Sequence, residues 1–595
     1  MSLMQSNILE SKYLFFGFIS GAQKVISQQN ELNRINIFPV ADSDTGTNLG
    51  NTFYSVIHSL HPEKSCPILI NKIADHAING AKGNSGVIIA QFLHGISCET
   101  NHLTNINLNS FANALKNSVK QLYEAVANPV EGTILTVIRE WSEFFYEKKE
   151  STDGFFKVFE ESLEIAKKSL SSTTQKMEML KKAKLVDAGA KGFVLFLEGI
   201  MEFLKTGKIV RTPTSVNTSP LEIIEDIDTF PVYRFCTEGV IMKKHNEISF
   251  DEIKKYLLTQ GDSVVLAGGG ERLHFHVHTN TPDKVINHMI KQNHILVHHK
   301  VDDMLTQYNW KHNNTNEYVL VVDSVSDIPQ ELLDKNQIYI APFFVEHNGI
   351  SYLDKRTIKT SAVYDWIQNS KHQISTAQPG TKSLKTIYNM GLNSGKKIIS
   401  LHTSSHLTSS YQSAQMIQKE IGNEQILAYD SYSITGGLGI LAIRIAKALE
   451  EGISGELLEQ KIEEWRDKVN LFVNFPTLKY ARKSGRLSLV KGAIGQLMNV
   501  KPILSVNNKG KIEFEDKAFS NKSGAEKLIK QVEKRMGNHK IWGYTITHSG
   551  SEYTQMVLDF MMEKTGLPPV YINETSPVIG TYAGPNAICV SFMIE

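Results

Sequence analysis

The spacing of apolar residues changes twice along the 595-residue chain. Up to about Thr206, apolar side chains recur with a period near 3.6 residues, which predicts an all-α region. From Tyr233 to about Gln307, short β-like runs alternate with helical runs, as is typical of a small α+β domain. From Asn316 to Glu595, strand-like and helical segments alternate again, which predicts an α/β region. We therefore expect a multidomain protein.

The domain boundaries are expected where periodicity is lost. Residues 211–228 are rich in Thr, Ser and Pro and then in acidic side chains, a composition typical of a linker. The predicted domains are residues 1–210, 229–310 and 316–595. A chain of this length exceeds what one hydrophobic core supports, and it fits roughly three or four domains.

Composition excludes several classes of protein. Hydrophobic residues make up 41% and charged residues 21%, and the net charge of +1 lacks the basic excess of a nucleic-acid-binding protein. The four cysteines (Cys66, Cys98, Cys236 and Cys589) are widely spaced, which argues against a disulfide framework and predicts a reducing, cytoplasmic location. Because no run approaches the ~18 apolar residues of a membrane span, we expect no membrane segment.

Two carboxylates stand two residues apart in the loop from Asn36 to Asn48, directly before a helical apolar pattern. Mg²⁺ is usually held by one or two carboxylates, with waters and substrate phosphates completing its shell, so Asp42 and Asp44 are candidate ligands. Anions are also favoured at a helix N-terminus. The candidate phosphate contacts after the acids are Thr45, Thr47 and Asn48. The alternative interpretation is an Asx-turn that only caps the helix.

Three further Gly-containing loops precede helical patterns in the same region: residues 80–86, 130–133 and 186–192. Each alone is more typical of tight helix packing. Four such loops, three of them carrying acids, are better explained by a nucleotide site. The candidate cofactor-binding residues from these loops are Gly83, Asn84, Ser85, Gly86, Thr133, Asp187 and Gly189.

These motifs, in this order, resemble the ATP-binding domain of dihydroxyacetone kinases, in the version found in bacterial fatty acid kinases. The resemblance covers about the first 205 residues and implies an eight-helix barrel. It implies that Asp42 and Asp44 hold Mg²⁺ on the ATP phosphates, and that Ser85, Gly86, Thr133 and Asp187 line the nucleotide. Asn36 stands nearest to a third acid of the family and is a further candidate metal ligand. Ser43 replaces the family's usual glycine and Lys82 its usual arginine.

In the middle domain, His274, His276 and His278 alternate with apolar residues, so on a strand all three rings share one face at a spacing suited to zinc. Cys236 could add a thiolate. The alternative is a solvated sheet with a histidine face. The surrounding motifs resemble the central domain of fatty acid kinases, which implies zinc on Cys236, His276 and His278 and leaves His274 outside the set.

The last ~280 residues resemble the DegV family of fatty-acid-binding proteins. The resemblance is carried by motifs such as Val322-Asp-Ser-x-Ser-Asp327, Thr376-Ala-Gln-Pro379 and Gly580-Thr-x-x-Gly-Pro585. A fatty acid site needs hydroxyls and a cation at the mouth of an apolar tunnel, where burial contributes about 0.8 kcal/mol per CH₂. The candidate substrate-binding residues are Thr376, Ser404, Ser405, Arg486 and Tyr582. Alternatively, Ser404 or Ser405 caps a helix. Ala377, Ser409, Phe519 and Tyr582 depart from the usual residues of the family.

Together these resemblances imply a fatty acid kinase fused to its acyl-binding partner, using ATP, Mg²⁺ and Zn²⁺ to make an acyl phosphate. They imply a fatty acid substrate, a downstream acyltransferase that consumes the product, and a homodimer. One alternative is a lipid-binding or regulatory protein with a degenerate kinase site, suggested by Ser43, Phe519 and Tyr582. A second is a dihydroxyacetone-type kinase, although the covalent substrate histidine of those enzymes is not found.

Overall fold

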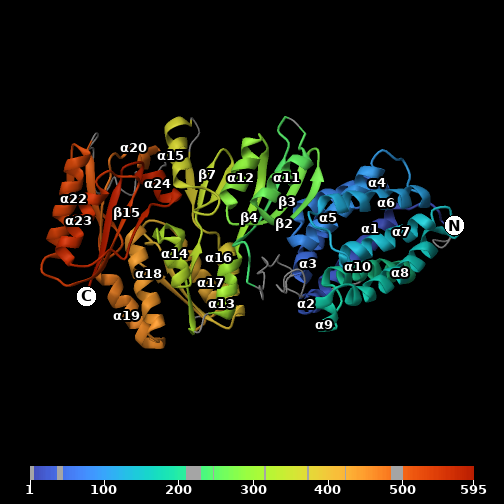
Figure 1. Ribbon diagram of the computed structural model, residues 1–595, viewed down its shortest axis with the longest axis horizontal. Helices are drawn as coiled ribbons and strands as arrows, with labels where there is room; N and C mark the ends of the chain where they lie inside the picture. The colour runs from blue at the N-terminus through green and yellow to red at the C-terminus, as the bar shows by residue number, and fades with distance from the viewer. Residues whose placement is uncertain are drawn as a thin grey trace. The chain divides into compact units, whose positions relative to one another are not determined.

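The computed structural model describes residues 6–36, 45–209, 230–245, 247–313, 316–370, 374–422, 424–483 and 500–595. Its contacts divide the chain into two compact units, Met1–Tyr308 and Asn309–Glu595 (Figure 1). The first unit contains both the helical region and the small α+β domain. The multidomain fold class expected from the sequence is confirmed.

The helical region contains eight long helices and two of six residues among its described segments. They are α1 (Ser11–Ser27), α2 (Gln29–Arg34), α3 (Thr45–Ser59), α4 (Cys66–Gly80), α5 (Gly83–Thr100), α6 (Leu108–Ala125), α7 (Ile134–Glu147), α8 (Gly154–Lys176), α9 (Glu178–Ala183) and α10 (Ala188–Thr206). Aromatic rings fill the core around Trp141, which packs edge-on against Phe145 and Phe193 and donates from Nε1 to Ser162 Oγ at 3.0 Å.

The middle domain is a four-stranded antiparallel sheet in the order β2-β3-β1-β4. Its strands are β1 (Phe235–Met242), β2 (Gly261–Gly269), β3 (Arg272–Thr279) and β4 (Ile295–Asp303), and its helices are α11 (Phe250–Gln260) and α12 (Pro282–Lys291). The sequence pattern did not identify β4. Helices α11 and α12 pack on one face, and the other face packs on the helical region. Val265 and Ala267 of β2 belong to the hydrophobic core of that region.

The period-two alternation of β3 decides which side chains face the helices of the first region. Leu273, Phe275 and Val277 are fully buried on one face. His274, His276 and His278 occupy the opposite face, where His274 Nδ1 lies 3.0 Å from the backbone oxygen of Ile78 in α4. The histidine face predicted from the sequence is therefore buried against the helical region.

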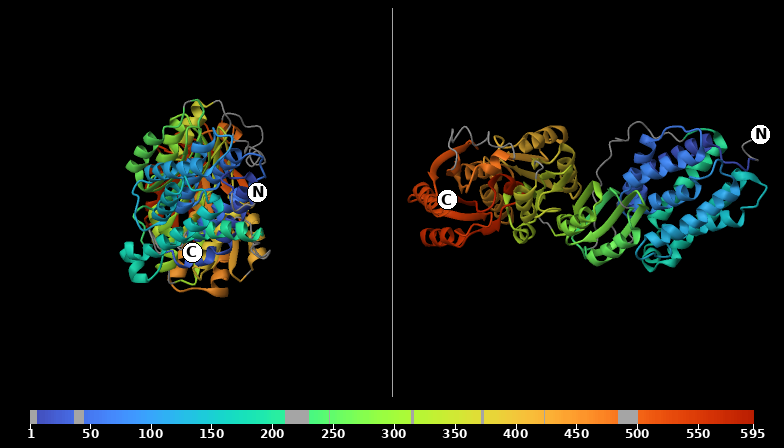
Figure 2. Two further views of the ribbon diagram at one scale, coloured as in Figure 1. Left: turned by 90° about the vertical axis from the view of Figure 1, so that its right-hand side faces the viewer. Right: turned by 90° about the horizontal axis from the view of Figure 1, so that it is seen from above.

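The described residues of the second unit form three sheets, and Figure 2 shows strands and helices alternating along this unit. Strands β5 (Tyr318–Asp323), β6 (Ile338–Ala341), β10 (Lys397–His402) and β11 (Ile426–Asp430) form a parallel sheet in the order β11-β10-β5-β6. Strands β12 (Val469–Asn474), β13 (Lys501–Val506), β14 (Ile512–Ala518), β15 (Ile541–His548), β16 (Tyr571–Glu574) and β17 (Ile588–Ile594) form a mixed sheet in the order β14-β13-β12-β17-β15-β16. Strands β7 (Phe344–His347), β8 (Ile350–Leu353) and β9 (Ser375–Ala377) form the third sheet.

Helices cover these sheets, as an α/β fold requires. They are α14 (Gln330–Lys335), α15 (Thr360–Asn369), α16 (Thr381–Asn393), α17 (Ser410–Ile421), α18 (Thr435–Glu450), α19 (Gly455–Lys468), α20 (Lys479–Lys483), α22 (Asn521–Met536), α23 (Thr554–Thr565) and α24 (Pro577–Ala583), while α13 (Met304–His312) spans the boundary at Tyr308. Phe472 and Phe592 of the six-stranded sheet share a core with Leu528 of α22 and Met561 of α23. In the described part of the chain, no helix combines the length and apolarity that a bilayer crossing needs.

Candidate functional site

The loops predicted to bind nucleotide meet where their helices begin. Asn48 lies in the first turn of α3, and its Nδ2 atom is 2.2 Å from where a Cβ on Gly83 would lie. Gly83 starts α5 with a φ of +56°, a conformation that favours glycine. The backbone N–H of Lys82 also donates to Thr52 Oγ1 at 3.1 Å. The starts of α3 and α5 are therefore in direct contact.

The starts of α5, α7 and α10 meet in the same way. A Cβ on Gly189 would lie 3.1 Å from Ser85 Oγ, 3.4 Å from Asp187 Oδ1 and 3.4 Å from the side chain of Ile134. Thr133 is the N-cap of α7 and Asp187 the N-cap of α10, where its Oδ1 accepts from Ala190 N–H at 2.7 Å. Helix N-termini carry partial positive charge, so this cluster of helix starts suits an anion such as phosphate.

Asp187 is the titratable group at this junction. Burial raises its pKa from 3.8 to about 6, although hydrogen bonds from the backbone of Ala190 and Ile134 act in the opposite direction. Buried carboxyl groups whose pKa is raised in this way are often found at functional sites. Near it, Asn84 Oδ1 is buried and has no hydrogen-bond partner among the described residues, which leaves an acceptor available to a ligand.

The start of α3 is held by α2. Asn33 donates from Nδ2 to Thr47 Oγ1 at 2.7 Å and accepts from Thr47 N–H at 3.0 Å. Thr45 is buried in the same turn, and Asn36 is buried at the end of the preceding described segment. Asp42, Ser43 and Asp44 lie outside the described residues. The structure therefore defines the helix start beside the predicted magnesium ligands but not the ligands themselves.

The three residues predicted to bind zinc lie together. One ligand atom from each of Cys236, His276 and His278 can be chosen so that all lie within 4.8 Å of one another. Cys236 Sγ is 3.8 Å from His276 Nδ1, and both residues are buried. His274 lies outside this group and contacts Ile78 instead. A thiolate and two imidazoles are ligands that zinc prefers, so the donor set fits.

Burial favours the neutral form of two imidazoles on this face, those of His274 and His278. It lowers the pKa of His278 to about 3, with a contribution from neighbouring His276, and lowers the pKa of His274 to about 4. A neutral imidazole has a lone pair with which to bind a metal ion at neutral pH.

Glu238, to which the sequence pattern assigned no role, lies between this cluster and the helix starts. Its Oε1 accepts from Gly83 N–H at 2.8 Å and lies 3.1 Å from His276 Nδ1. Burial opposes ionisation of Glu238, but the His276 hydrogen bond and the charge of Lys82 outweigh it, so its pKa lies well below the ordinary value. The period-two spacing from Cys236 places Glu238 on the same face of β1, and this signal could have identified it.

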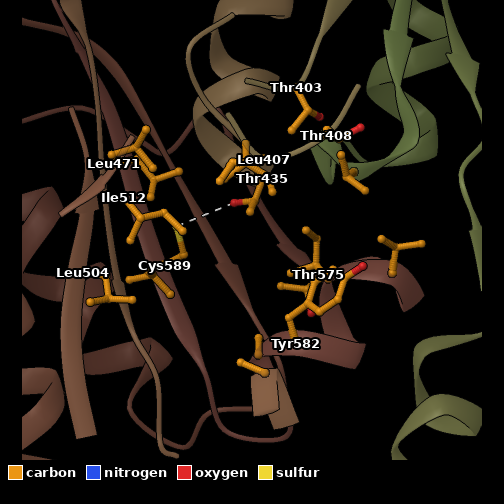
Figure 3. A pocket seen from close by; sticks show the side chains of 18 of the residues that line it. Thr403, Leu407, Thr408, Thr435, Leu471, Leu504, Ile512, Thr575, Tyr582 and Cys589 are labelled. Atoms are coloured by element: carbon orange, nitrogen blue, oxygen red, sulfur yellow. Dashed lines mark hydrogen bonds between the residues drawn. The ribbon is translucent and has the colours of Figure 1, made fainter. Parts of the chain in front are cut away.

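The second unit encloses a cavity of about 560 Å³ between the parallel sheet and the six-stranded sheet (Figure 3). Its walls are mainly apolar. They include Val325, Phe343, Leu407, Ile434, Leu471, Val473, Phe475, Leu504, Val506, Ile512, Val578, Ile579, Ile588 and Cys589. A cavity of this size and character suits a small amphiphile with a long apolar part.

Several hydroxyl groups line the cavity. Thr376 and Tyr582 both line it, and their hydroxyls are hydrogen-bonded to each other. Ser405 lines it as well, whereas Ser404 does not and instead donates to the backbone oxygen of Gly510 at 2.8 Å. Further lining hydroxyls that the sequence pattern did not single out belong to Thr403, Thr408, Thr435, Ser505, Thr547 and Thr575.

The cavity has few charged groups in its lining. None of the described lining residues is Lys or Arg, and His406 is the imidazole among them. Arg486, predicted as the cation of the site, lies outside the described residues. Phe519, another departure from the expected pattern, is 75% exposed and does not line the cavity. Among the described residues, head-group recognition therefore depends on hydroxyls.

A buried carboxylate positions the loop that carries several of these hydroxyls. Asp323 ends β5 and is fully buried. Its Oδ2 accepts from Thr403 N–H and from Ser410 Oγ, each at 2.8 Å, and its Oδ1 lies 3.0 Å from His402 Nδ1. Thr403 Oγ1 itself is buried with no hydrogen-bond partner in the described part of the chain, so it can donate to a bound head group.

Family models assign each part of this architecture. Residues 39–202 match the DAK2 domain. Residues 232–311 match the FakA-like middle domain of fatty acid kinases. Residues 317–595 match the DegV family of uncharacterised proteins. The three matches, to a DAK2 domain, a FakA-like middle domain and the DegV family, follow one another along the chain in the order that the sequence resemblances predicted.

Individual relatives share only part of this arrangement. Uncharacterised proteins of Staphylococcus saprophyticus and Staphylococcus haemolyticus are 33% and 32% identical to the chain over 301 residues. These matches cover 49% of the chain and 54% of each relative, so the chain spans about half the length of the curated relatives it matches. A fatty-acid-binding DegV family protein from Thermus thermophilus is 25% identical, with a TM-score of 0.44, over 47% of this chain and all of that one. DegV of Bacillus subtilis is 23% identical, with a TM-score of 0.43, over the same shares.

Proposed function

We propose that the chain phosphorylates a fatty acid with ATP to give an acyl phosphate, and that its DegV-family domain holds the acyl chain. The observation that carries the proposal is the mainly apolar cavity of about 560 Å³ with hydroxyls in its lining, in a chain that also matches a DAK2 domain. The match of residues 232–311 to the FakA-like middle domain of fatty acid kinases supports a carboxylic acid as the phosphate acceptor.

The chemistry requires little from the protein besides position and charge. A fatty acid carboxylate is already a nucleophile, so no general base is needed. One carboxylate oxygen bonds to the γ-phosphorus of ATP, the bond from that phosphorus to the β,γ-bridging oxygen breaks, and ADP leaves. Holding the two reactants in line and stabilising the phosphoryl charge would then supply most of the rate.

The DAK2 domain supplies the proposed ATP site. The adjoining starts of α3, α5, α7 and α10 present backbone N–H groups to the phosphates, and Asn84 Oδ1 offers a buried acceptor. Asp42 and Asp44 would hold Mg²⁺, with Asn36 close by in the sequence. When bound, the ion would neutralise charge on the transferring phosphoryl group.

In the middle domain, Cys236, His276 and His278 would hold Zn²⁺. Because the three residues are contributed by two neighbouring strands, we propose a structural role in which the ion fixes β1 to β3.

At the cavity, Ser405 and the Thr376–Tyr582 pair are the proposed carboxylate contacts. The two hydroxyls of that pair are hydrogen-bonded to each other. When a carboxylate binds, each hydroxyl can donate to it instead, so neither is left without a partner. Arg486 is the proposed cation of the site.

The decisive experiment compares the wild-type chain with Asp42→Ala, and with Asp75→Ala as a control for removing an exposed carboxylate from the same region. Fatty acid should stimulate ATP turnover in the wild type and in the control but not in Asp42→Ala, while all three bind fatty acid equally. Stimulated turnover in Asp42→Ala would refute the assignment of the metal site. A wild-type chain that binds fatty acid without any stimulated turnover would instead indicate a lipid-binding or regulatory protein.

Three consequences complete the proposal. An acyl phosphate is an activated acyl donor, so we expect an acyltransferase to consume it. We also expect the chain to form a homodimer. The expected location is the cytoplasm. Light scattering of the purified chain tests the dimer. Hydroxylamine converts an acyl phosphate to a hydroxamate. Formation of the fatty acyl hydroxamate in its presence would identify the reaction product as an acyl phosphate.

A further inference from the structure

Glu238 is the only described carboxylate that contacts both a proposed zinc ligand and the proposed ATP loop. It belongs to β1, two residues after Cys236, and its side chain is 8% exposed. A single atom, Oε1, makes both contacts: Gly83 N–H at 2.8 Å and His276 Nδ1 at 3.1 Å. These partners are 155 and 38 residues away in the sequence.

The contact with Gly83 completes the N-terminus of α5. The N-cap residue Lys82 has no side-chain capping hydrogen bond, so the first turn of α5 has no acceptor from its own cap. Glu238 supplies that acceptor from another domain, and its negative charge is favoured at the positive end of the helix. The same turn contains Asn84, Ser85 and Gly86, which the proposed function assigns to ATP.

The contact with His276 orients the imidazole. Nδ1 lies 3.1 Å from Oε1, so in the tautomer that carries its proton on Nδ1 the ring donates to this carboxylate oxygen. The lone pair is then on Nε2, which is buried and has no hydrogen-bond partner among the described residues. A carboxylate behind a histidine in this way orients the ring and makes its other nitrogen a stronger ligand.

We propose that Glu238 is a positioning residue that couples metal binding in the middle domain to nucleotide binding in the DAK2 domain. The inference rests on the proposed function, because it assumes that zinc and ATP bind at the two sites. When His276 binds a metal ion, its ring is fixed, and Oε1 is fixed with it. The acceptor at the start of α5 then stays in place, and the N–H groups of that turn remain directed at the phosphates. By thermodynamic linkage, ATP must strengthen zinc binding by the same factor as zinc strengthens ATP binding.

The test uses the full chain and two variants of this residue, Glu238→Ala and Glu238→Gln. Glu271→Ala is the matched control, since Glu271 is an exposed carboxylate in the same domain with a single lysine partner. Zinc affinity is measured by competition with a chromophoric chelator, and MgATP affinity by calorimetry with and without zinc. Amide hydrogen exchange of peptides covering residues 82–86 is followed in zinc-free protein.

In the wild type and in Glu271→Ala, zinc should tighten MgATP binding about fivefold or more. Glu238→Ala should weaken zinc binding by about 10- to 100-fold, remove the effect of zinc on MgATP affinity, and speed exchange in residues 82–86. Glu238→Gln should keep the protection of residues 82–86, since an amide oxygen still accepts from Gly83, but should bind zinc more weakly than the wild type. This variant also decides the matter if Glu238→Ala fails to fold.

The inference would be overturned by unchanged zinc affinity in both Glu238 variants, or by a zinc effect on MgATP affinity that is the same in the wild type and in the variants. A wild-type chain that binds zinc and MgATP independently of each other would also overturn it, and would leave the proposed function intact. A wild-type chain that binds neither would overturn the proposed function itself.

Discussion

Replacing Asp187 by Asn should make the first unit more stable, and by an amount that depends on pH. Asp187 is 5% exposed as a residue, and folding raises the pKa of its carboxyl from 3.8 to about 6. Since each tenfold change in proton affinity is worth about 1.4 kcal/mol, the fully ionised carboxylate lowers the unfolding free energy by about 3 kcal/mol. Asn is as good an N-cap as Asp, so the hydrogen bond to Ala190 can be kept.

The sign of the pH dependence follows from which state ionises first. Below pH 3.8 the carboxyl is protonated in both states and costs nothing. As the pH rises towards 6, the unfolded chain ionises while the native chain stays protonated, so the native state loses relative stability. Between pH 5 and pH 7 this loss amounts to about 1 kcal/mol. Asp187→Asn has no such loss, so its advantage over the wild type should grow by that amount.

The assay must report on the first unit alone. Trp141 is the only tryptophan in residues 1–308, and it is buried. Labelling with 5-fluorotryptophan gives one fluorine signal from this unit, and its urea titration at pH 5 and pH 7 yields the unfolding free energies. Groups that titrate in both chains, and any pH-independent cost of the amide, cancel in the comparison. An equal difference between the two chains at pH 5 and pH 7 would refute the reasoning.

Three further predictions concern the other sites. Gly83→Ala places a Cβ 2.2 Å from Asn48 Nδ2 at a φ of +56°. The substitution should lower the free energy of unfolding, measured by urea titration, by at least about 1 kcal/mol and should weaken MgATP binding. The control Gly207→Ala has a similar φ but nothing within 4 Å of the new Cβ, so it should leave MgATP binding unchanged. Cys236→Ser should lower bound zinc below about a tenth of an equivalent by elemental analysis, whereas Cys98→Ser, at an exposed cysteine, should retain it; equal zinc in both would contradict the site. Thr376→Val and Tyr582→Phe should each weaken fatty acid binding by about five- to tenfold in a fluorescent-lipid displacement assay, as the loss of one hydrogen bond implies, while Tyr553→Phe, away from the cavity, should have no effect.

Local pattern was enough to predict the helical region and the face of β3. Helices α6, α7 and α8 lie in the region that the apolar period predicted to be all-α, because a long amphipathic pattern is decided by burial of one face. Likewise, the alternation of His274, His276 and His278 placed all three rings on one side of the sheet. Strand β4 went unidentified, since Ile295 and Val297 are exposed and its two histidines interrupt the apolar alternation.

Contacts between distant segments were beyond the reach of sequence pattern. Nothing in the spacing of Glu238 relates it to Gly83, 155 residues away, although Gly83 stands in a loop that the sequence had singled out and Glu238 lies two residues after Cys236. The same holds for Ser404 and Ser405: they are adjacent and chemically alike, and only the position of Gly510 separates the buried hydroxyl from the one at the cavity. Periodicity describes neighbours on one element, whereas such distinctions depend on which elements meet.

The packing of the middle-domain sheet on the helices implies that domain borders drawn from sequence families are not the borders of cooperative folding. Val265 and Ala267 lie in the same apolar core as Phe53 and Trp141, so neither part can lose its structure without exposing surface of the other. The helical region and the sheet should therefore melt in one transition and exchange their slowest amides together. If the chain were cut after residue 209, the helical region and the sheet would each expose an apolar surface to water. We expect the smaller fragment, which contains the sheet, to aggregate.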